Sequence, residues 1–255
     1  MMEQLVPEPV VAVERFGDEG VEGASLYPEE QALLTQSMAK RRREFATVRF
    51  CARRAMEKLG VPPAPVLPGE RRAPQWPAGL IGSMTHCEGY NAAALARATD
   101  LASVGIDAEP HQGLPKGVLE SIALPSERAR LVHLRAQDSS VHWDRLLFSA
   151  KESVYKAWFP LTGKWLDFSD ADIDITVTPC SAPAFAAHSG TFRAQLLVPG
   201  PVVGGLRVPT FEGRWMVGDG LVGTAVTVPH GGAQGAELRA WGLSNKRLFQ
   251  DLRRC

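Results

Sequence analysis

Two carboxylates stand one residue apart at the end of an apolar stretch, SVGIDAEP at 103–110. Val104 and Ile106 alternate with small and polar residues, which predicts a β-strand. Because successive strand side chains point to opposite faces, Asp107 and Glu109 are expected to share one face. Neighbouring carboxylates repel unless a cation lies between them or one is protonated. Such hard oxygen donors suit Mg²⁺, although an acidic pair at a strand end is more often simply solvated.

A second polar pair lies in WDRLLFSAKESVYKAWFPLTG at 143–163, a segment with helical periodicity. Glu152 and Lys156 are four residues apart, so they share one face of the predicted helix. By itself this spacing describes an ion pair on a solvated surface. Beside the Asp107 and Glu109 pair, it adds a third carboxylate and a cation to a candidate site.

Cations gather on the first predicted amphipathic helix, 39–60, and in the proline-rich loop after it. The planar fork of arginine makes paired, charge-assisted hydrogen bonds to phosphate, and His86 can donate to a phosphate oxygen. A solvated basic face or a nucleic-acid-binding surface gives the same pattern. Taken with the acids, the cations describe a site for a phosphate-rich ligand held with Mg²⁺. They are Lys40, Arg41, Arg42, Arg43, Arg49, Arg53, Arg54, Arg71 and Arg72.

The elements that must position these groups recur along the chain. A short helix followed by a long helix is predicted at 27–60 and again at 124–163, with strands after each pair. In that register Arg53 aligns with Lys156. We therefore predict an α+β fold of two similar halves related by a pseudo-two-fold, with the ligand cleft between them.

The predicted division places the nucleotide- and phosphate-binding half at 1–102. The second half, 103–255, carries the metal-binding and catalytic motifs. Within it, 179–209 is rich in Pro, Gly and Ala and is predicted to be a loop insertion, although TFRAQLLV at 191–198 is also predicted to be a strand. The tail 229–255 shows no pattern.

Composition limits the class of protein. The 255 residues are 45% hydrophobic and 22% charged, with a formal net charge of zero, so a partner must be met by a local patch. Four scattered cysteines without metal-ligand spacing favour a reduced, cytoplasmic protein. No apolar run approaches the ~20 residues of a membrane span, and the acidic, proline-broken first residues are unlike a signal peptide.

The motifs resemble those of the 4′-phosphopantetheinyl transferases of the surfactin-synthetase type, and most closely the actinobacterial and enterobactin-synthesis branch. VGIDAEP fits the family pattern G-[IV]-D-x-E, and FSAKESVYKAW fits [FW]-x-x-K-E-[AS]-x-x-K at every position. RRREFATVRFCARRAMEKLG, RRAPQWP and GSMTHCEGY resemble the upstream blocks of that family. The likeness covers roughly residues 25–175, and the two core motifs stand in the family's order and spacing.

The resemblance implies that the chain transfers the 4′-phosphopantetheine arm of coenzyme A to a serine of an acyl or peptidyl carrier protein. Adenosine 3′,5′-bisphosphate would be released. Mg²⁺, or Mn²⁺ in its place, is the implied cofactor, and coenzyme A is the co-substrate. The implied partners are carrier domains of polyketide and nonribosomal peptide biosynthesis, with no nucleic acid and no membrane, and the implied working unit is a monomer.

The resemblance also implies roles for single residues. The implied metal ligands are Asp107, Glu109, Glu152 and the backbone or a water at Ala108. The implied catalytic residues are Asp107, Glu152 as the base for the serine proton, and Lys156 at the leaving group; the ligand and base roles of Glu152 compete. The implied coenzyme A-binding residues are Arg41, Arg49, Arg71, Arg72, Ala73, Pro74, Thr85, His86, Asp107, Lys151 and Lys156. The implied carrier contacts are Leu114, Lys116 and Val118.

Three other functions are weighed against this one. A nucleic-acid-binding module built on helix 39–60 predicts salt-sensitive binding, but the zero net charge and the lack of aromatic residues among the arginines speak against it. A Mg²⁺ nuclease with Glu-x-Lys on a strand has no lysine at that spacing after Glu109. A non-catalytic descendant of the transferases finds no support, because both motifs are intact.

Overall fold

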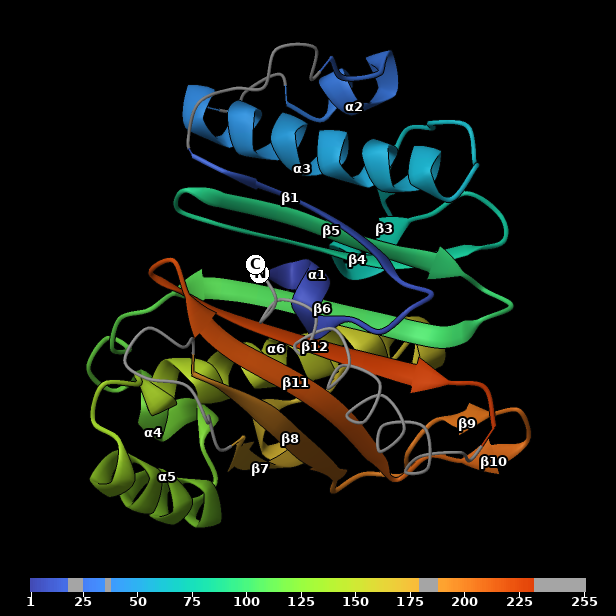
Figure 1. Cartoon of the computed structure of the whole chain (residues 1–255). Helices are drawn as coiled ribbons and strands as arrows, with labels where there is room; N and C mark the ends of the chain where they lie inside the picture. The colour runs from blue at the N-terminus through green and yellow to red at the C-terminus, as the bar shows by residue number, and fades with distance from the viewer. Residues whose placement is uncertain (18–24, 35–37, 179–187, 232–255) are drawn as a thin grey trace, which may run out of the picture.

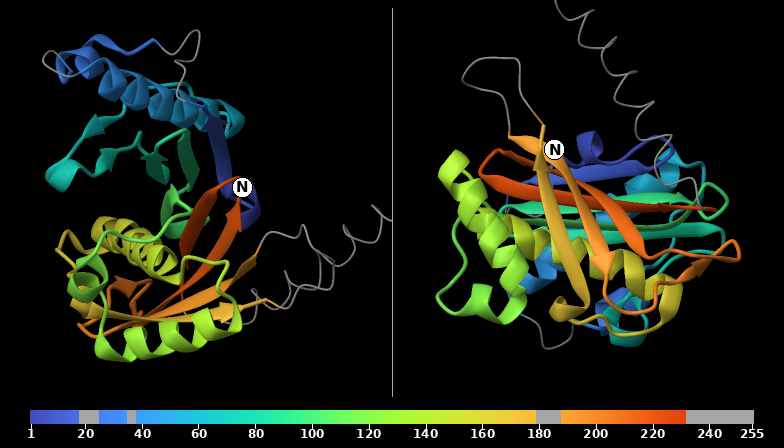
Figure 2. Two further views of the ribbon diagram at one scale, coloured as in Figure 1. Left: turned by 90° about the vertical axis from the view of Figure 1, so that its left-hand side faces the viewer. Right: turned by 90° about the horizontal axis from the view of Figure 1, so that it is seen from below.

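The structure is a computed structural model that describes residues 1–17, 25–34, 38–178 and 188–231. It contains a three-stranded antiparallel sheet in the order β1-β5-β4 and a five-stranded antiparallel sheet in the order β6-β12-β11-β8-β7. One long helix packs on each sheet, as Figures 1 and 2 show. The predicted α+β class is confirmed.

The first part of the chain builds the smaller sheet and the helices above it. The long helix α3 packs on β5 and β1, and the short helix α2 precedes it. The elements are α1 (Met2–Leu5), β1 (Val11–Phe16), α2 (Pro28–Ala32), α3 (Ala39–Lys58), β2 (Leu67–Pro68), the 3-10 helix η1 (Glu70–Arg72), β3 (Pro74–Gln75), β4 (Leu80–Cys87) and β5 (Tyr90–Arg97).

The remaining part builds the larger sheet, and its long helix α6 packs on β6 and β12. The elements are β6 (Leu101–Pro110), α4 (Val118–Ile122), α5 (Pro125–Gln137), α6 (Trp143–Thr162), η2 (Phe168–Asp170), β7 (Ala171–Val177), β8 (Ser189–Leu196), β9 (Val202–Val203), β10 (Leu206–Arg207), β11 (Thr210–Gly218) and β12 (Leu221–Pro229).

Strand β5 separates two apolar cores by its two-residue period. Ala93 and Leu95 pack beneath α3 with Cys51, Ala52 and other residues of that helix. The alternate side chains of β5 face the opposite way and pack against β6 and α1. A third core fills the space between α6 and the larger sheet. Both faces of β5 are therefore buried, which explains its nearly continuous run of small apolar residues.

The two sheets meet where β4 runs beside β6. The amide of Ile106 donates to Ser83 Oγ at 3.0 Å, and the amide of Ala108 donates to Thr85 Oγ1 at 3.1 Å. Two side-chain hydroxyls of β4 thus satisfy backbone groups of β6 that do not pair with β12. This contact fixes the acidic end of β6 against the smaller sheet.

Helix α6 approaches β6 very closely at Gly105. A Cβ atom at this position would lie 2.1 Å from the Ser153 carbonyl oxygen and 2.6 Å from the Ala157 amide nitrogen. Only glycine leaves room for the helix backbone here. The glycine of the VGID motif therefore sets the distance between the two elements that carry the candidate site.

Each long helix is tied to the short helix before it by a buried glutamate. Glu30 of α2 accepts a hydrogen bond from Arg53 of α3 at 3.1 Å, and Glu127 of α5 pairs with Lys151 of α6 at 2.9 Å. The two glutamate anchors are alike. The register predicted from the sequence aligned Arg53 with Lys156, but Lys156 pairs with Asp107 and not with Glu127. The pseudo-two-fold relation of the halves stays a prediction, as does the boundary between 1–102 and 103–255.

The prediction of a loop over 179–209 is wrong within the described residues. Strand β8 lies between β11 and β7 in the larger sheet, and its side chains alternate between buried and exposed. The strand predicted for TFRAQLLV at 191–198 is confirmed by β8 (Ser189–Leu196). Residues 179–187 and most of the tail 229–255 lie outside the described residues.

Candidate active site

A cleft of about 790 Å³ opens between the two long helices. Its walls come from α3, from the segment containing η1 and β3, from β4 and from α6. Nine of the residues predicted to bind the ligand or to act on it share this lining. They are Arg41, Arg49, Arg71, Arg72, Ala73, Pro74, His86, Glu152 and Lys156. Residues far apart in sequence are thus brought to one place.

Asp107 lies on β6 at the meeting of the two sheets and is only 4% exposed. Its Oδ1 accepts hydrogen bonds from Lys156 Nζ at 2.8 Å and from Thr85 Oγ1 at 3.2 Å. Its Oδ2 is buried and lacks a hydrogen-bond partner among the described residues. A buried carboxylate oxygen without a partner is poorly satisfied, and a cation bound here would supply the missing interaction.

Glu109 also faces α6, because the period of the strand puts it on the same side as Asp107. Its Oε2 accepts a hydrogen bond from Arg145 at 2.9 Å. Burial and the neighbouring Asp107 raise the pKa of Glu109, and Arg145 opposes that rise. Glu109 is therefore already paired with a cation of the chain.

Glu152 lines the cleft one helical turn before Lys156. Burial raises the pKa of Glu152; the charge of Lys156 works against that shift and the charge of Asp107 adds to it. A carboxylate with a raised pKa is a stronger base once it is ionised. This is the environment that suits a group accepting a proton.

The predicted gathering of three carboxylates around one ion stays a prediction, and in this structure two of the three acids are paired with cations of the chain. The described residues contain no group of three or more His, Cys, Asp or Glu side chains placed to hold a metal. The physical reason is the pair of cations on α6. Lys156 holds Asp107 and Arg145 holds Glu109, so each acid turns toward its own partner.

Arg41 and His86 meet at the α3 side of the cleft. Arg41 donates to His86 Nε2 at 2.6 Å, so this ring nitrogen is an acceptor, because a guanidinium can only donate. Burial and the charge of Arg41 lower the pKa of His86 below 6.5. The ring is neutral at neutral pH and retains its other nitrogen as a donor.

Arg71 and Arg72 occupy the left-handed backbone region, with φ of 49° and 64°. Residues other than glycine rarely adopt this backbone conformation, and strained residues of this kind are concentrated at ligand-binding sites. The guanidinium carbon of Arg71 lies 5.4 Å from the ring centroid of Trp165, a cation–π distance. Trp165 follows α6, so this contact joins the two walls of the cleft.

Several residues predicted to bind the ligand have partners within the fold. Thr85 is buried outside the cleft lining, where its hydroxyl donates to Asp107 and accepts from the Ala108 amide. Arg49 borders the cleft, but its Nε donates to the Val66 carbonyl at 3.0 Å and its guanidinium lies over the Phe45 ring. Lys151 is not in the cleft lining at all: its ammonium contacts Glu127 and donates to two backbone carbonyls. The predicted binding of coenzyme A by Lys151 therefore finds no support in the structure, because its side chain leaves α6 on the side of α5 and β7.

Some residues of the site could not be predicted from the sequence motifs. Tyr155, Trp76 and Phe45 line the cleft, but aromatic residues at helical or loop positions usually belong to a core. Arg145 could have been found, because it precedes Glu152 by seven residues and so shares a face of α6 with it. Of the predicted carrier contacts, Leu114 is half-buried, Lys116 is exposed and Val118 begins α4.

Taken together, the fold and the cleft define a class of enzyme. A basic, partly apolar cleft with a buried carboxylate and an acid–lysine pair suits an enzyme that handles a phosphorylated ligand. No helix within the described ranges is long and apolar enough to cross a membrane.

Comparison with known proteins gives the family. The 4'-phosphopantetheinyl transferase N-terminal domain matches residues 29–96, and the 4'-phosphopantetheinyl transferase superfamily matches residues 103–199. The chain is 55% identical to the 4'-phosphopantetheinyl transferase Svp of Streptomyces mobaraensis, over 89% of each chain. It is 47% identical to the transferase Npt of Nocardia iowensis, over 89% of this chain and 99% of that one. It is 48% identical to the transferase PptT of Mycobacterium tuberculosis, over 81% of this chain and 87% of that one.

The chain belongs to the 4′-phosphopantetheinyl transferase superfamily and is a transferase of the actinobacterial type. The resemblance predicted from the motifs is confirmed. It extends beyond residues 25–175, since the relatives align over most of the chain.

Proposed function

We propose that the cleft binds coenzyme A and presents its pyrophosphate to a serine of an acyl or peptidyl carrier protein. The observation that carries this proposal is the meeting, in one cleft, of the cations of α3 and η1 with Glu152 and Lys156 of α6. The serine oxygen forms a bond to the phosphorus that bears the pantetheine arm. The bond from that phosphorus to adenosine 3′,5′-bisphosphate breaks.

A divalent metal ion fits the residues beside the cleft. Asp107 Oδ2 is a buried oxygen without a partner among the described residues, and Glu152 adds a second hard oxygen donor. We infer that Asp107 and Glu152 hold Mg²⁺, with Glu109 and the Ala108 backbone close by. Such an ion would neutralise charge on the diphosphate.

Glu152 and Lys156 are suited to handling the proton and the charge of the reaction. Glu152, with its raised pKa, accepts the proton of the serine hydroxyl when it is not itself bound to the metal, because the ligand and base roles compete. Lys156 is 26% exposed and reaches both Asp107 and the Ile106 carbonyl, so it has freedom to turn toward the leaving phosphate. Arg41, Arg72 and the donor nitrogen of His86 bind the remaining phosphate oxygens.

The working unit is proposed to be one chain acting in the cytoplasm. Both walls of the cleft come from the same chain, so the site is complete without a second copy. Cys51 and Cys87 are free thiols, which suits a reducing compartment. The carrier is proposed to dock at residues 111–124, which follow the acidic end of β6.

The nucleic-acid alternative loses support from the placement of the arginines. Arg49 and Arg53 of α3 are buried against Glu30, so the helix does not present all its cations on one outer face. A groove-binding helix needs its basic side chains at the surface.

The experiment is mass spectrometry of an apo carrier protein incubated with the chain, coenzyme A and Mg²⁺. The expected product is the carrier with the phosphopantetheine arm on serine. Glu152→Gln should lower kcat by about 10²–10⁴-fold, the range for loss of a general base, and Asp107→Asn should abolish transfer.

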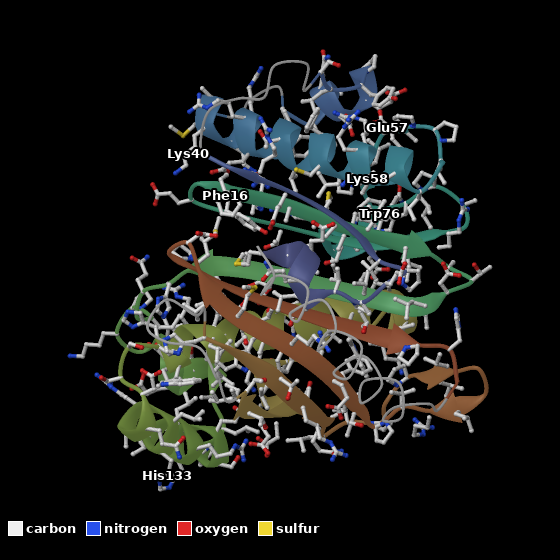
Figure 3. The ribbon with its side chains drawn as sticks, in the orientation of Figure 1. Phe16, Lys40, Glu57, Lys58, Trp76 and His133 are labelled. Carbon is white, nitrogen blue, oxygen red and sulfur yellow. The ribbon has the colours of Figure 1, made fainter. Side chains whose placement is uncertain are left out.

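The matched control is Glu57→Gln, at an exposed carboxylate on the outer side of α3, labelled in Figure 3. This variant should transfer the arm at the wild-type rate. Absence of product from the wild-type chain, or full turnover by both site variants, would contradict the proposed function.

A further inference from the structure

Arg145 lies in the first turn of α6, and its side chain is nearly buried. Its guanidinium donates in three directions. One bond reaches Glu109 Oε2 at 2.9 Å, a second reaches the Gln112 carbonyl at 3.0 Å and a third reaches the Gly113 carbonyl at 3.2 Å. A single side chain of α6 therefore holds an acid of β6 and the backbone that follows it.

The neighbours of Arg145 hold the same stretch of chain. The Leu114 amide donates to Asp144 Oδ2 at 2.8 Å, and the His142 amide donates to His111 Nε2 at 3.0 Å. The beginning of α6 thus binds the segment 109–114 through side chains and backbone together. Residues 109–111 are also held by β12 and by the Gly220 carbonyl, so the contacts with α6 matter most for residues 112–114.

Arg145, Glu152 and Lys156 share one face of α6, at spacings of seven and four residues. The two cations at the ends of this row differ in what surrounds them. Lys156 lines the cleft and is partly exposed, whereas Arg145 is absent from the residues that line it. Lys156 can therefore contact a ligand in the cleft in place of Asp107. The guanidinium of Arg145, by contrast, is bonded within the fold and lies away from the ligand.

We propose that Arg145 is a positioning residue of the transferase, and this inference rests on the function proposed above. It holds Glu109 beside Asp107 and fixes the backbone of Gln112 and Gly113 at the start of α6. Arginine is required because its planar fork serves three acceptors that an ammonium group cannot reach together. Without it, Glu109 stands unpaired beside Asp107, and like charges repel.

The test compares Arg145→Gln and Arg145→Lys with the wild type. Coenzyme A affinity, measured by calorimetry without metal, should stay within about twofold, because the arginines of the cleft lie on other elements and Lys156 lies eleven residues further along α6. The kcat/KM for the carrier should fall at least about tenfold in both variants. Amide exchange at Leu114 should quicken at least about tenfold, because its segment loses three hydrogen bonds.

Arg128→Gln on α5 is the matched control, since it removes an exposed arginine and should change none of the three measurements. Full activity of Arg145→Lys would overturn the proposal, because the fork would then be unnecessary. A parallel loss of coenzyme A affinity would also overturn it, since the whole cleft would then have collapsed. Leu114 exchange needs no transfer, so it separates failure of this inference from failure of the proposed function.

Discussion

Charged side chains of this protein lie either at the cleft or in the interior, and their ion-pair partners distinguish the two groups. Lys151 and Lys156 lie five residues apart on α6. Lys151 pairs with Glu127 beside α5, whereas Lys156 pairs with Asp107 beside β6. The two lysines of one motif therefore serve different purposes, one in stability and one in the site.

Replacement of Lys151 by methionine should destabilise the fold but should leave coenzyme A binding intact. Lys151→Met leaves Glu127 as a buried charge without its partner, which costs about 3–5 kcal/mol in comparable pairs. Urea unfolding measures this loss, and calorimetry should show coenzyme A affinity close to that of the wild type. Lys164→Met, at an exposed lysine, should change neither quantity. A weakened coenzyme A affinity with unchanged stability would show instead that Lys151 binds the ligand.

Stability should depend on pH through His86. Burial and Arg41 lower the pKa of His86 in the folded protein, so the unfolded chain binds a proton more readily. The free energy of unfolding therefore falls as the pH drops below about 6.5 toward the lowered pKa. Urea unfolding at about pH 7.5 and about pH 5.5 should show a smaller difference for His86→Gln than for the wild type. Equal differences would mean that His86 does not contribute.

At the scale of elements, the site depends on how closely α6 lies on β6. One element supplies Asp107 and Glu109, and the other supplies Glu152 and Lys156. Gly105 permits the close approach, because even one methyl group there would meet the helix backbone. A packing feature of the motif thus controls the distance between Asp107 of β6 and Glu152 of α6.

Gly105→Ala should weaken both stability and transfer. Overpacking of this kind costs about 1–3 kcal/mol, and the helix must shift, because the atoms it would meet belong to backbone. Denaturant unfolding and the transfer assay together measure the effect. In the unfolding measurement, Gly113→Ala controls for the loss of a glycine, because its added Cβ would come no closer than 3.8 Å to its neighbours. Unchanged values for Gly105→Ala would show that α6 can move freely.

Across the whole molecule, the cleft is assembled from both parts of the chain. The hydroxyls of Ser83 and Thr85 join β4 to β6, and Arg71 reaches Trp165 across the opening. A ligand in the cleft therefore contacts elements from each part at once. Binding should stabilise the molecule as one unit.

Coenzyme A should raise the unfolding free energy of the whole chain in a single transition. At a concentration of 100 times Kd, the expected gain is about 2.7 kcal/mol. Calorimetry with increasing ligand should move one transition upward without dividing it. Two transitions, of which only one responds, would show that the ligand contacts one part alone.

Much of the fold and part of the site could be predicted from the sequence, because periodicity is local. Three- and four-residue spacing predicted α3 and α6, and the two-residue period put Asp107 and Glu109 on the same side of β6. Strand β8 had two conflicting predictions, because TFRAQLLV has a strand pattern but lies in a segment whose Pro, Gly and Ala content indicates a loop. The order of the two acidic motifs carried the family resemblance, which the related proteins confirm.

The sequence by itself determined which residue types share a strand or helix face, since backbone geometry fixes side-chain direction. Only the tertiary structure decided which face meets which neighbour. Arg145 reaches Glu109 across dozens of residues of chain, and Lys151 turns to α5 while Lys156 turns to β6. These choices follow from packing and charge pairing between distant segments, and local patterns do not contain that information.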